Sequence, residues 1–471
     1  MKTKFLKIIT LVFCMALFLT GCATVSDVLD KNGKQIYFED PVYFQGQVAR
    51  VGDYLYYANA YVDVTTEDGF NYAENAKVAY LNRINLDEIK FADDVWDENY
   101  DHTSPLGIEK VNGEKLVGYQ NQQMYAYGNY LYFTSASVHK TEDMLNEFDK
   151  ISLFRVAFNG DGLTEIGTFG NDENSTITLQ KGSDDKVYFV VVAPSENGSE
   201  KELEAGDDEK VYDIISIEVG DGIGQQRILV EDVEDAVVAD ETSTKRDVVY
   251  TYAPEQEGLV SAVASVDFAT GDISSHDAGG EQEINLIDRV GDEVFYSYKN
   301  EVYFKNVTIA GTFSASNGQR FYSAPSISEI EKIGNGYIFK GTSSLIYKES
   351  LTSSSTALIS SADYAGSQVL FVDGEYIYIS STSEIARITV EGEKEVLVSG
   401  MTIVAGQCGY DGDYVYFYAK RGELKVPEGE EVEDSTEGEE ETEEVVDNNQ
   451  YLYQVDKNGN IQLLSYVEDK E

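Results

Sequence analysis

Apolar and polar residues alternate in short runs along this chain, and one such run recurs eight times. Each copy opens with Gly, Asp or Asn and continues with β-branched or aromatic residues, as in Gly-Asp-Tyr-Leu-Tyr-Tyr at residues 52–57. The other copies begin at residues 128, 185, 247, 291, 334, 374 and 412. A period of two that starts at a tight turn is typical of a β-strand. The pattern therefore predicts eight equivalent strands.

A second phrase follows several of these copies and predicts a partner strand. It spans residues 81–87, 153–160, 385–392 and 451–456, and in the C-terminal half two further apolar stretches follow, at 395–398 and 402–405. Four strands per unit, repeated every roughly 40 to 75 residues, is the pattern of a β-propeller with insertions of variable length.

The predicted fold is therefore all-β, a β-propeller of eight four-stranded blades. A blade alone buries one side of its sheet, whereas radial stacking covers both faces and leaves only short edges. Seven blades are the alternative, if the unit around Asp247–Phe268 is an insertion, and an array of two-sheet sandwiches is a more distant one. Residues Lys34–Gln45 precede the first full unit and are expected to complete the last blade, so that the two chain ends clasp.

The N-terminal residues resemble a bacterial lipoprotein signal peptide. Lys2, Lys4 and Lys7 precede the apolar run Ile8–Leu19, and small residues lead to Cys22. The run is shorter than the roughly 20 residues that span a bilayer, which disfavours a transmembrane anchor. The resemblance implies cleavage after residue 21 and a lipid on Cys22. We expect residues 1–21 to be the signal peptide, 22–33 a membrane tether and 34–471 the propeller, lipid-anchored at the cell membrane on its extracytoplasmic side.

Charge and cysteine content narrow the possible partners. Removal of three lysines with the signal peptide changes the net charge from −50 to −53, so nucleic acid and anionic lipid headgroups would repel the protein. The membrane partner must then be the lipid on Cys22. Because Cys14 leaves with the signal peptide, Cys408 is the one remaining thiol and no internal disulfide can form.

The two phrases together resemble bacterial lipoproteins that carry a β-propeller domain of unknown function, related to the low-density-lipoprotein-receptor type. The resemblance rests on the Tyr-x-Tyr strand after Gly-Asp and on an apolar strand that carries Arg83, Arg155 or Arg387, and it covers Val51 to Val467. The receptor family's Trp-Thr-Asp is absent, since the single tryptophan, Trp96, lies outside every copy. The resemblance therefore implies a fold and no peptide ligand.

Four units have long acidic insertions between their first and second phrases. These are Asp63–Ala76, His139–Asp149, Ser195–Lys210 and Glu428–Asp447, and the last forms an acidic low-complexity loop at residues 427–447. Equivalent connections leave a propeller at one face, so one face should be strongly acidic. The candidate acidic binding face comprises Asp63, Glu67, Asp68, Glu142, Asp143, Glu202, Glu204, Asp207 and Asp208. The alternative is that these runs are solvated loops without a binding role.

Catalytic and metal-binding patterns are sparse. Three histidines, His102, His139 and His276, lie away from any Gly-x-Ser-x-Gly turn, and with one free cysteine they cannot supply a usual zinc set. Residues 220–224 (Gly-Asp-Gly-Ile-Gly) resemble a phosphate loop but are better explained as a hairpin turn. Residues 159–162 and 456–460 alternate oxygen ligands as calcium loops do, although hairpin turns are again preferred. No catalytic residue, metal site or cofactor is assigned, and calcium is kept only as an alternative.

The sequence thus favours a non-enzymatic β-propeller lipoprotein that binds or scaffolds an unidentified protein or glycan of the cell envelope. One alternative is a carbohydrate-binding or glycoside-hydrolysing propeller, because glycoside hydrolysis needs only two carboxylates across a cleft. Another is a structural role like that of the propeller lipoprotein subunit of the outer-membrane barrel assembly machinery.

Overall fold

The computed structural model describes residues 28–29, 34–46, 48–58, 78–79, 81–86, 109–110, 117–118, 123–136, 150–172, 174–195, 211–280, 283–314, 316–323, 327–341, 344–358, 367–374, 376–420 and 450–465. These residues form strands and turns, so the all-β prediction is confirmed. Within these ranges no helix is long and apolar enough to cross a membrane.

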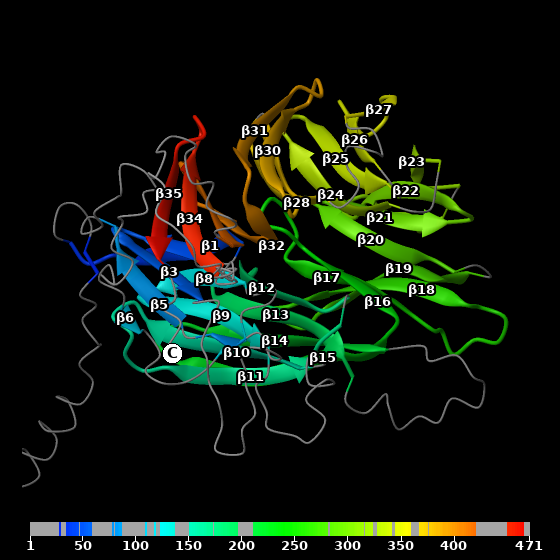
Figure 1. The fold of residues 1–471 in the computed structure, drawn as a ribbon. Coiled ribbons are helices and arrows are strands. Elements are labelled where there is room, and N and C mark those ends of the chain that lie inside the picture. The colour runs from blue at the N-terminus through cyan, green and yellow to red at the C-terminus, as the bar shows by residue number, and fades with distance from the viewer. Residues whose placement is uncertain are drawn as a thin grey trace, which may run out of the picture.

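Six separate sheets of four antiparallel strands follow one another along the chain (Figure 1). The first contains β2 (Val48–Val51), β3 (Tyr54–Ala58), β5 (Leu81–Asn85) and β6 (Glu109–Lys110). The second and third contain β12 (Thr176–Lys181), β13 (Val187–Pro194), β14 (Tyr212–Val219) and β15 (Ile223–Val233), then β16 (Asp235–Val238), β17 (Asp247–Tyr252), β18 (Ser261–Asp267) and β19 (Ile273–Gly280). The fourth and fifth contain β20 (Asn285–Val290), β21 (Glu293–Tyr298), β22 (Glu301–Asn306) and β23 (Gln319–Tyr322), then β24 (Ile327–Ile333), β25 (Gly336–Gly341), β26 (Leu345–Lys348) and β27 (Ser355–Ala357). The sixth contains β28 (Gln368–Asp373), β29 (Tyr376–Ser380), β30 (Glu384–Thr389) and β31 (Lys394–Ser399), and a short pair joins β4 (Val78–Ala79) to β7 (Val117–Gly118).

The remaining strands form one nine-stranded sheet. Its strands are β8 (Met124–Gly128), β9 (Tyr130–Ala136), β10 (Lys150–Ala157), β11 (Thr164–Gly170), β1 (Phe38–Gly46), β32 (Thr402–Tyr410), β33 (Tyr414–Lys420), β34 (Gln450–Asp456) and β35 (Ile461–Ser465). The sheet joins a blue strand to red ones in Figure 1, because the N-terminal strand β1 lies between β8 and β32.

The fold is a β-propeller, but the predicted blade count is wrong. The described residues contain six separate four-stranded sheets, neither eight nor seven. The physical reason is that β1 pairs with β8 on one side and with β32 on the other, which merges two repeat units into one continuous sheet. The unit around Asp247–Phe268 is a complete sheet and no insertion. All eight predicted Gly-Asp strands do form, and each is the second strand of its repeat unit.

The N-terminal strand closes the ring, although in a different way from the prediction. Gln45 pairs with Tyr410 and Gly46 with Gly409, so β1 does join the last unit. It pairs with the first strand of that unit, whereas a strand that completes a blade would pair with the last one. Most of β1 is hydrogen-bonded to β8, where Phe38 pairs with Gly128 and Phe44 with Met124.

The core lies between neighbouring sheets. In β13 the side chains of Phe189 and Val191 pack against the preceding unit, in a cluster with Tyr132, whereas Tyr188 and Val190 pack against the following unit. Successive side chains of a strand point to opposite faces of the sheet, and here both faces are buried. Strand β13 is therefore apolar at nearly every position. Repeated sheet-to-sheet packing of this kind gives a large apolar core, and Cys408, the cysteine within the described ranges, forms no disulfide.

The arginine of the second phrase has a structural role in three units. The guanidinium groups of Arg83, Arg155 and Arg387 lie 4.6, 4.5 and 4.4 Å from the ring centres of Tyr54, Tyr130 and Tyr376, which are the first tyrosines of the Tyr-x-Tyr strands. Each arginine is paired across the sheet with the second tyrosine and stacks diagonally over the first. The two phrases therefore recur together because cation–π stacking joins the second strand to the third.

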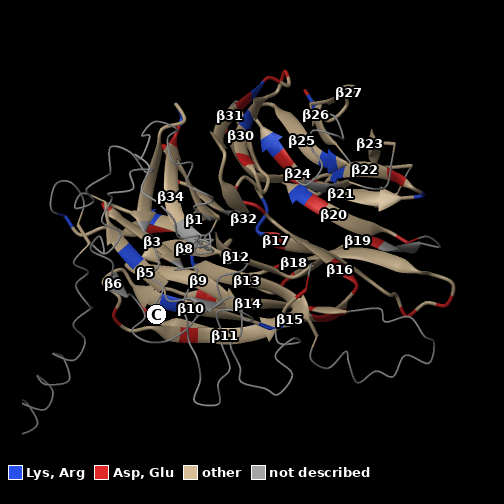
Figure 2. Ribbon diagram, in the orientation of Figure 1, with Lys and Arg blue, Asp and Glu red and all other residues tan. Residues whose placement is uncertain are grey.

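The first strands of successive units are tied by polar side chains. In one case the Tyr125 hydroxyl donates to the Ile177 carbonyl (2.5 Å), and in another the Ile330 N–H donates to Asp288 Oδ2 (2.8 Å). Figure 2 shows acidic and basic residues side by side on β20 and β24, where such contacts occur. Each of these bonds satisfies a backbone group of the next unit, which fixes the units relative to one another.

Candidate functional site

A pocket of about 550 Å³ lies where the ring closes. Its walls come from four places in the chain: residues 42–45 of β1, Arg50 and Gly52 at the end of β2, residues 372–373 at the end of β28, and residues 410–412 at the end of β32. The pocket exists because β1 enters the ring between the repeat units, which brings the side chain of Tyr43, 51% exposed, to this wall.

Asp411 is the most strongly held polar group of the pocket. Its Oδ2 atom accepts hydrogen bonds from Arg50 Nη1 (2.8 Å) and the Tyr416 hydroxyl (2.6 Å), and Oδ1 accepts from the backbone N–H groups of Asp413 and Tyr414. Burial of Asp411 favours its neutral form, but these hydrogen bonds outweigh burial and lower the pKa of the carboxyl. Asp411 is therefore charged at neutral pH and is a poor proton donor.

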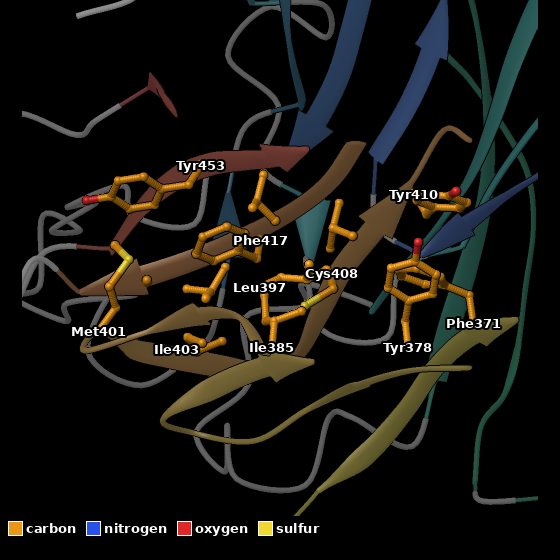
Figure 3. Close-up of a cluster of buried hydrophobic side chains, with 14 of the residues drawn as sticks. Phe371, Tyr378, Ile385, Leu397, Met401, Ile403, Cys408, Tyr410, Phe417 and Tyr453 are labelled. Carbon is orange, nitrogen blue, oxygen red and sulfur yellow. The ribbon is translucent and has the colours of Figure 1, made fainter. Parts of the chain in front are cut away.

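Tyr410 forms a second polar contact in the pocket and is supported by aromatic rings. Its hydroxyl donates to Asp373 Oδ2, to which Lys457 Nζ is also close (3.6 Å). Its ring stacks on Phe371 (centroids 4.8 Å apart, 8° between the planes) and contacts Tyr378, as Figure 3 shows. Burial, followed by the hydrogen bond to Asp373, raises the pKa of Tyr410 far above its usual value, so the hydroxyl stays protonated.

Figure 3 also places Cys408 among apolar side chains of the same cluster, which includes Leu397 and Phe417. Burial raises the pKa of this thiol to about 12. The thiolate, which is the reactive form of cysteine, is therefore essentially absent at neutral pH.

The pocket combines fixed charges with one exposed ring. Among the described residues, the lining has one cation, Arg50, and two carboxylates, Asp373 and Asp411, and Lys457 outside the lining also lies near Asp373. Arg50 keeps 34% of its side chain exposed, and Tyr43, whose ring contacts that of Tyr125 (centroids 5.2 Å apart), is half-exposed. These groups can hydrogen-bond and stack against a polar ligand, but Asp411 cannot serve as the general acid of a glycosidase.

One serine–histidine contact occurs in the described chain, between Ser265 Oγ and His276 Nε2 (2.9 Å). Ser265 is only 2% exposed, and burial lowers the pKa of His276. No substrate carbonyl could reach the buried hydroxyl, so this pair supports packing between strands β18 and β19.

The turns that resemble cation loops are held by their own amides. Asp456 accepts backbone N–H bonds from Asn458 (2.8 Å) and Asn460 (2.9 Å), and the Asn460 amide donates to its second oxygen. Asp161 and Asn159 are bonded in a similar way. Residues 220–222 form a hairpin turn between β14 and β15, as predicted. Within the described ranges no group of three His, Cys, Asp or Glu side chains could hold a metal ion.

The residues that the sequence singled out lie elsewhere in the chain. Cys22 and the candidate acidic face (Asp63, Glu67, Asp68, Glu142, Asp143, Glu202, Glu204, Asp207 and Asp208) are outside the described residues. Sequence reasoning missed Arg50, Asp373, Tyr410 and Asp411. A usable signal was present at Asp411-Gly412-Asp413, where a carboxylate precedes the glycine of the turn as well as following it.

No protein-family model and no curated protein matches this sequence. Among solved structures, the β-propeller domain of the Trilobed protease from Pyrococcus furiosus is similar at 11% identity and a TM-score of 0.37, with 73% of this chain and 96% of that one covered. Porphyromonas gingivalis dipeptidyl peptidase 4 is similar at 10% identity and a TM-score of 0.40 over 79% of this chain. This chain spans only 57% of that peptidase's length. The computationally designed Ika8 protein has 14% identity and a TM-score of 0.36, with coverage of 73% and 95%.

Proposed function

We propose that this protein is a lipid-anchored β-propeller on the extracytoplasmic side of the cell membrane, where it binds another component of the cell envelope without catalysing a reaction. The anchor is the lipid on Cys22, at the end of the basic and apolar N-terminal stretch. The bacterial lipoproteins that this sequence resembles carry a propeller domain in the same way.

The observation that supports binding most directly is the pocket at the ring closure. Arg50 and Asp411 are held at 2.8 Å, and Tyr410 is held by Asp373 and by the stack on Phe371. Because these side chains are already fixed, a ligand that binds them does not incur the entropy cost of ordering them, and this favours affinity. Tyr43 supplies an exposed ring beside them.

A pull-down from native envelope with the lipidated protein tests this proposal. Tyr43→Ala should reduce capture of the partner about five- to thirtyfold, because a stacked ring at a binding site contributes on the order of 1 to 2 kcal/mol. Tyr37→Ala is the matched control, since Tyr37 is similarly exposed (56%) but does not line the pocket. Equal capture by the two variants would exclude the pocket as the binding site.

The second candidate is a carbohydrate-binding or glycoside-hydrolysing protein, because Asp373 and Asp411 can accept hydrogen bonds from sugar hydroxyls and the ring of Tyr43 can contact a sugar. Incubation with glycan libraries separates the two functions. A purified sample that releases reducing ends above a heat-killed control would overturn the non-enzymatic assignment, whereas retention of a glycan without cleavage would identify the envelope component as a saccharide.

A further inference from the structure

The two faces of the propeller are distinguishable by their turns. Within a repeat unit the turn after the first strand and the turn after the third strand are hydrogen-bonded to each other: Leu86 N–H donates to the Asp53 carbonyl (2.7 Å), and Val307 N–H donates to the Asp292 carbonyl (2.9 Å). These two kinds of turn therefore share one face, which we call the turn face. The second strand of each unit runs away from it and ends at the opposite face.

Neighbouring units present their turns on the same side. The Ser243 hydroxyl, in the turn after β16, donates to the carbonyl of Gly291, in the turn after β20 (2.6 Å). Across the ring closure, Arg50 near the end of β2 reaches Asp411 just beyond β32. The turn face is thus continuous around the closure, and the pocket lined by Gly52, Asp373 and Asp411 lies on it.

The chain enters the propeller on this same face. Val28 is fully buried in a cluster with Ala49 and Val51, and its carbonyl accepts a hydrogen bond from Ile36 N–H (3.2 Å). The Leu29 carbonyl lies so close to Gly52, in the turn after β2, that a Cβ at Gly52 would be 3.2 Å from it. Val28 is therefore fixed beside the turn face.

Only six residue steps separate Val28 from Cys22. A fully extended chain covers at most about 3.5 Å per residue, so Val28 can lie no further than about 20 Å from the lipidated cysteine. We propose that the turn face, which carries the pocket, is held toward the bilayer. This inference rests on the proposed lipid at Cys22.

The opposite face then points away from the membrane. Strands β3, β9, β13 and β33 end there at Ala58, Ala136, Pro194 and Lys420, and the chain continues from each of them into one of the four acidic sequences. Interactions between exposed charges are screened over about 8 Å at physiological salt. Because the four acidic sequences begin at the face away from the membrane, their first residues lie farther than this screening length from anionic headgroups. It also implies that the pocket receives a partner located at the membrane.

Two cysteine positions in one repeat unit test the orientation. Glu391 is exposed in the turn between β30 and β31 on the turn face, and Ser383 is exposed in the tight connection between β29 and β30 on the opposite face. The strand between them, β30, has six residues and spans about 20 Å. Cys408 is 4% exposed, so Glu391→Cys and Ser383→Cys each provide a single accessible thiol for a donor dye.

The lipidated full-length variants are bound to the outer surface of phosphatidylcholine vesicles that contain a headgroup-labelled acceptor lipid. We expect energy transfer from position 391 to exceed transfer from position 383 at least about twofold, given the separation of the two sites. Equal transfer, or stronger transfer from position 383, would overturn the orientation while leaving the anchor intact. Variants that lack residues 1–21 and also carry Cys22→Ser have neither the apolar signal segment nor the lipid. They should not bind the vesicles, and binding equal to that of the lipidated protein would instead overturn the anchor itself.

Discussion

Arg289 and Asp247 form a buried ion pair between two repeat units, with Arg289 Nη1 2.7 Å from Asp247 Oδ1 and the arginine side chain fully buried. The same guanidinium donates to the carbonyls of Asp247 (3.0 Å) and Gly291 (3.1 Å). Arg289 therefore joins the first strand of one unit to the second strand of the unit before it. A charge removed from water in this way depends on all of these acceptors.

Arg289→Met should destabilise the protein by about 3 to 5 kcal/mol, because it leaves the Asp247 carboxylate buried without its cation. Chemical denaturation followed by tyrosine fluorescence measures the free energy of unfolding. Arg320→Met is the control, since the Arg320–Glu301 pair is exposed on the arginine side (61%) and should contribute less than about 1 kcal/mol. Similar losses in the two variants would show that the buried pair has no special role.

Asp235 should make the stability of the propeller fall as the pH rises. Burial raises the pKa of this carboxyl from 3.8 to about 6, although backbone N–H groups of Leu286 and Ala236 partly oppose the shift. Between about pH 4 and pH 6 the folded protein therefore binds more protons at this site than the unfolded chain, so this contribution to stability decreases with rising pH.

Asp235→Asn removes that penalty. We expect a gain of about 3 kcal/mol at pH 8 and less than about 1 kcal/mol at pH 4, since the shift is about two pKa units and one pKa unit corresponds to 1.36 kcal/mol. Thermal unfolding at both pH values measures the difference. A gain that is the same at the two pH values would mean that ionisation of Asp235 is not its source.

Gly46 should be essential to the closure of the ring. It has a φ of +92°, and a Cβ there would overlap the Cys408 carbonyl at 1.8 Å, at the point where β1 pairs with β32. Gly412 has a similar φ of +96°, yet a Cβ there would meet nothing within 4 Å. A side chain at either position would meet the same backbone strain, but only at Gly46 would it also clash with a neighbouring strand.

Gly412→Ala should cost about 1 kcal/mol from backbone strain, whereas Gly46→Ala should cost at least about 3 kcal/mol because β1 must also move away from β32. Differential scanning calorimetry of the two variants isolates the steric part of the effect. Equal melting temperatures would show that the β1–β32 contact is not needed for stability.

The repeat units could be predicted from the sequence because their signal is local. Glycine or asparagine turns, alternating tyrosines and the arginine that stacks on them lie within one unit, as Tyr54 and Arg83 illustrate. The closure could be predicted only in part. Residues 34–45 are expected from the sequence to join the last unit, and β1 does so, but nothing local shows that Gln45 pairs with the first strand of that unit or that most of β1 pairs with β8.

The pocket depends on that closure, and so it was missed as well. Arg50 and Asp411 are 361 residues apart and meet only because β1 and β2 lie beside β32. The acidic insertions were chosen as the candidate binding face because of their composition, but composition does not show which side chains the fold brings together. A search for carboxylates that precede the turn glycines would have included Asp411 and Asp373.

The last prediction concerns the acidic loop at residues 427–447, whose removal should leave the fold intact. Strands β33 and β34 pair along their whole length, from Tyr414 with Asp456 to Lys420 with Gln450, and Phe417 stacks on Tyr453 (5.5 Å). This pairing holds the last unit together whatever sequence connects the two strands.

The connecting sequence Glu428–Asp447 has twelve carboxylates and no basic residue, so its charges repel one another and ordering it would cost about 1 to 2 kcal/mol per residue in backbone entropy. Replacement by a short Gly-Ser turn should therefore change the melting temperature by no more than a few degrees. Unfolding of the shortened protein would show that the loop is structural. A stable shortened protein that no longer captures its partner from the envelope would move the binding site from the pocket to the acidic loop.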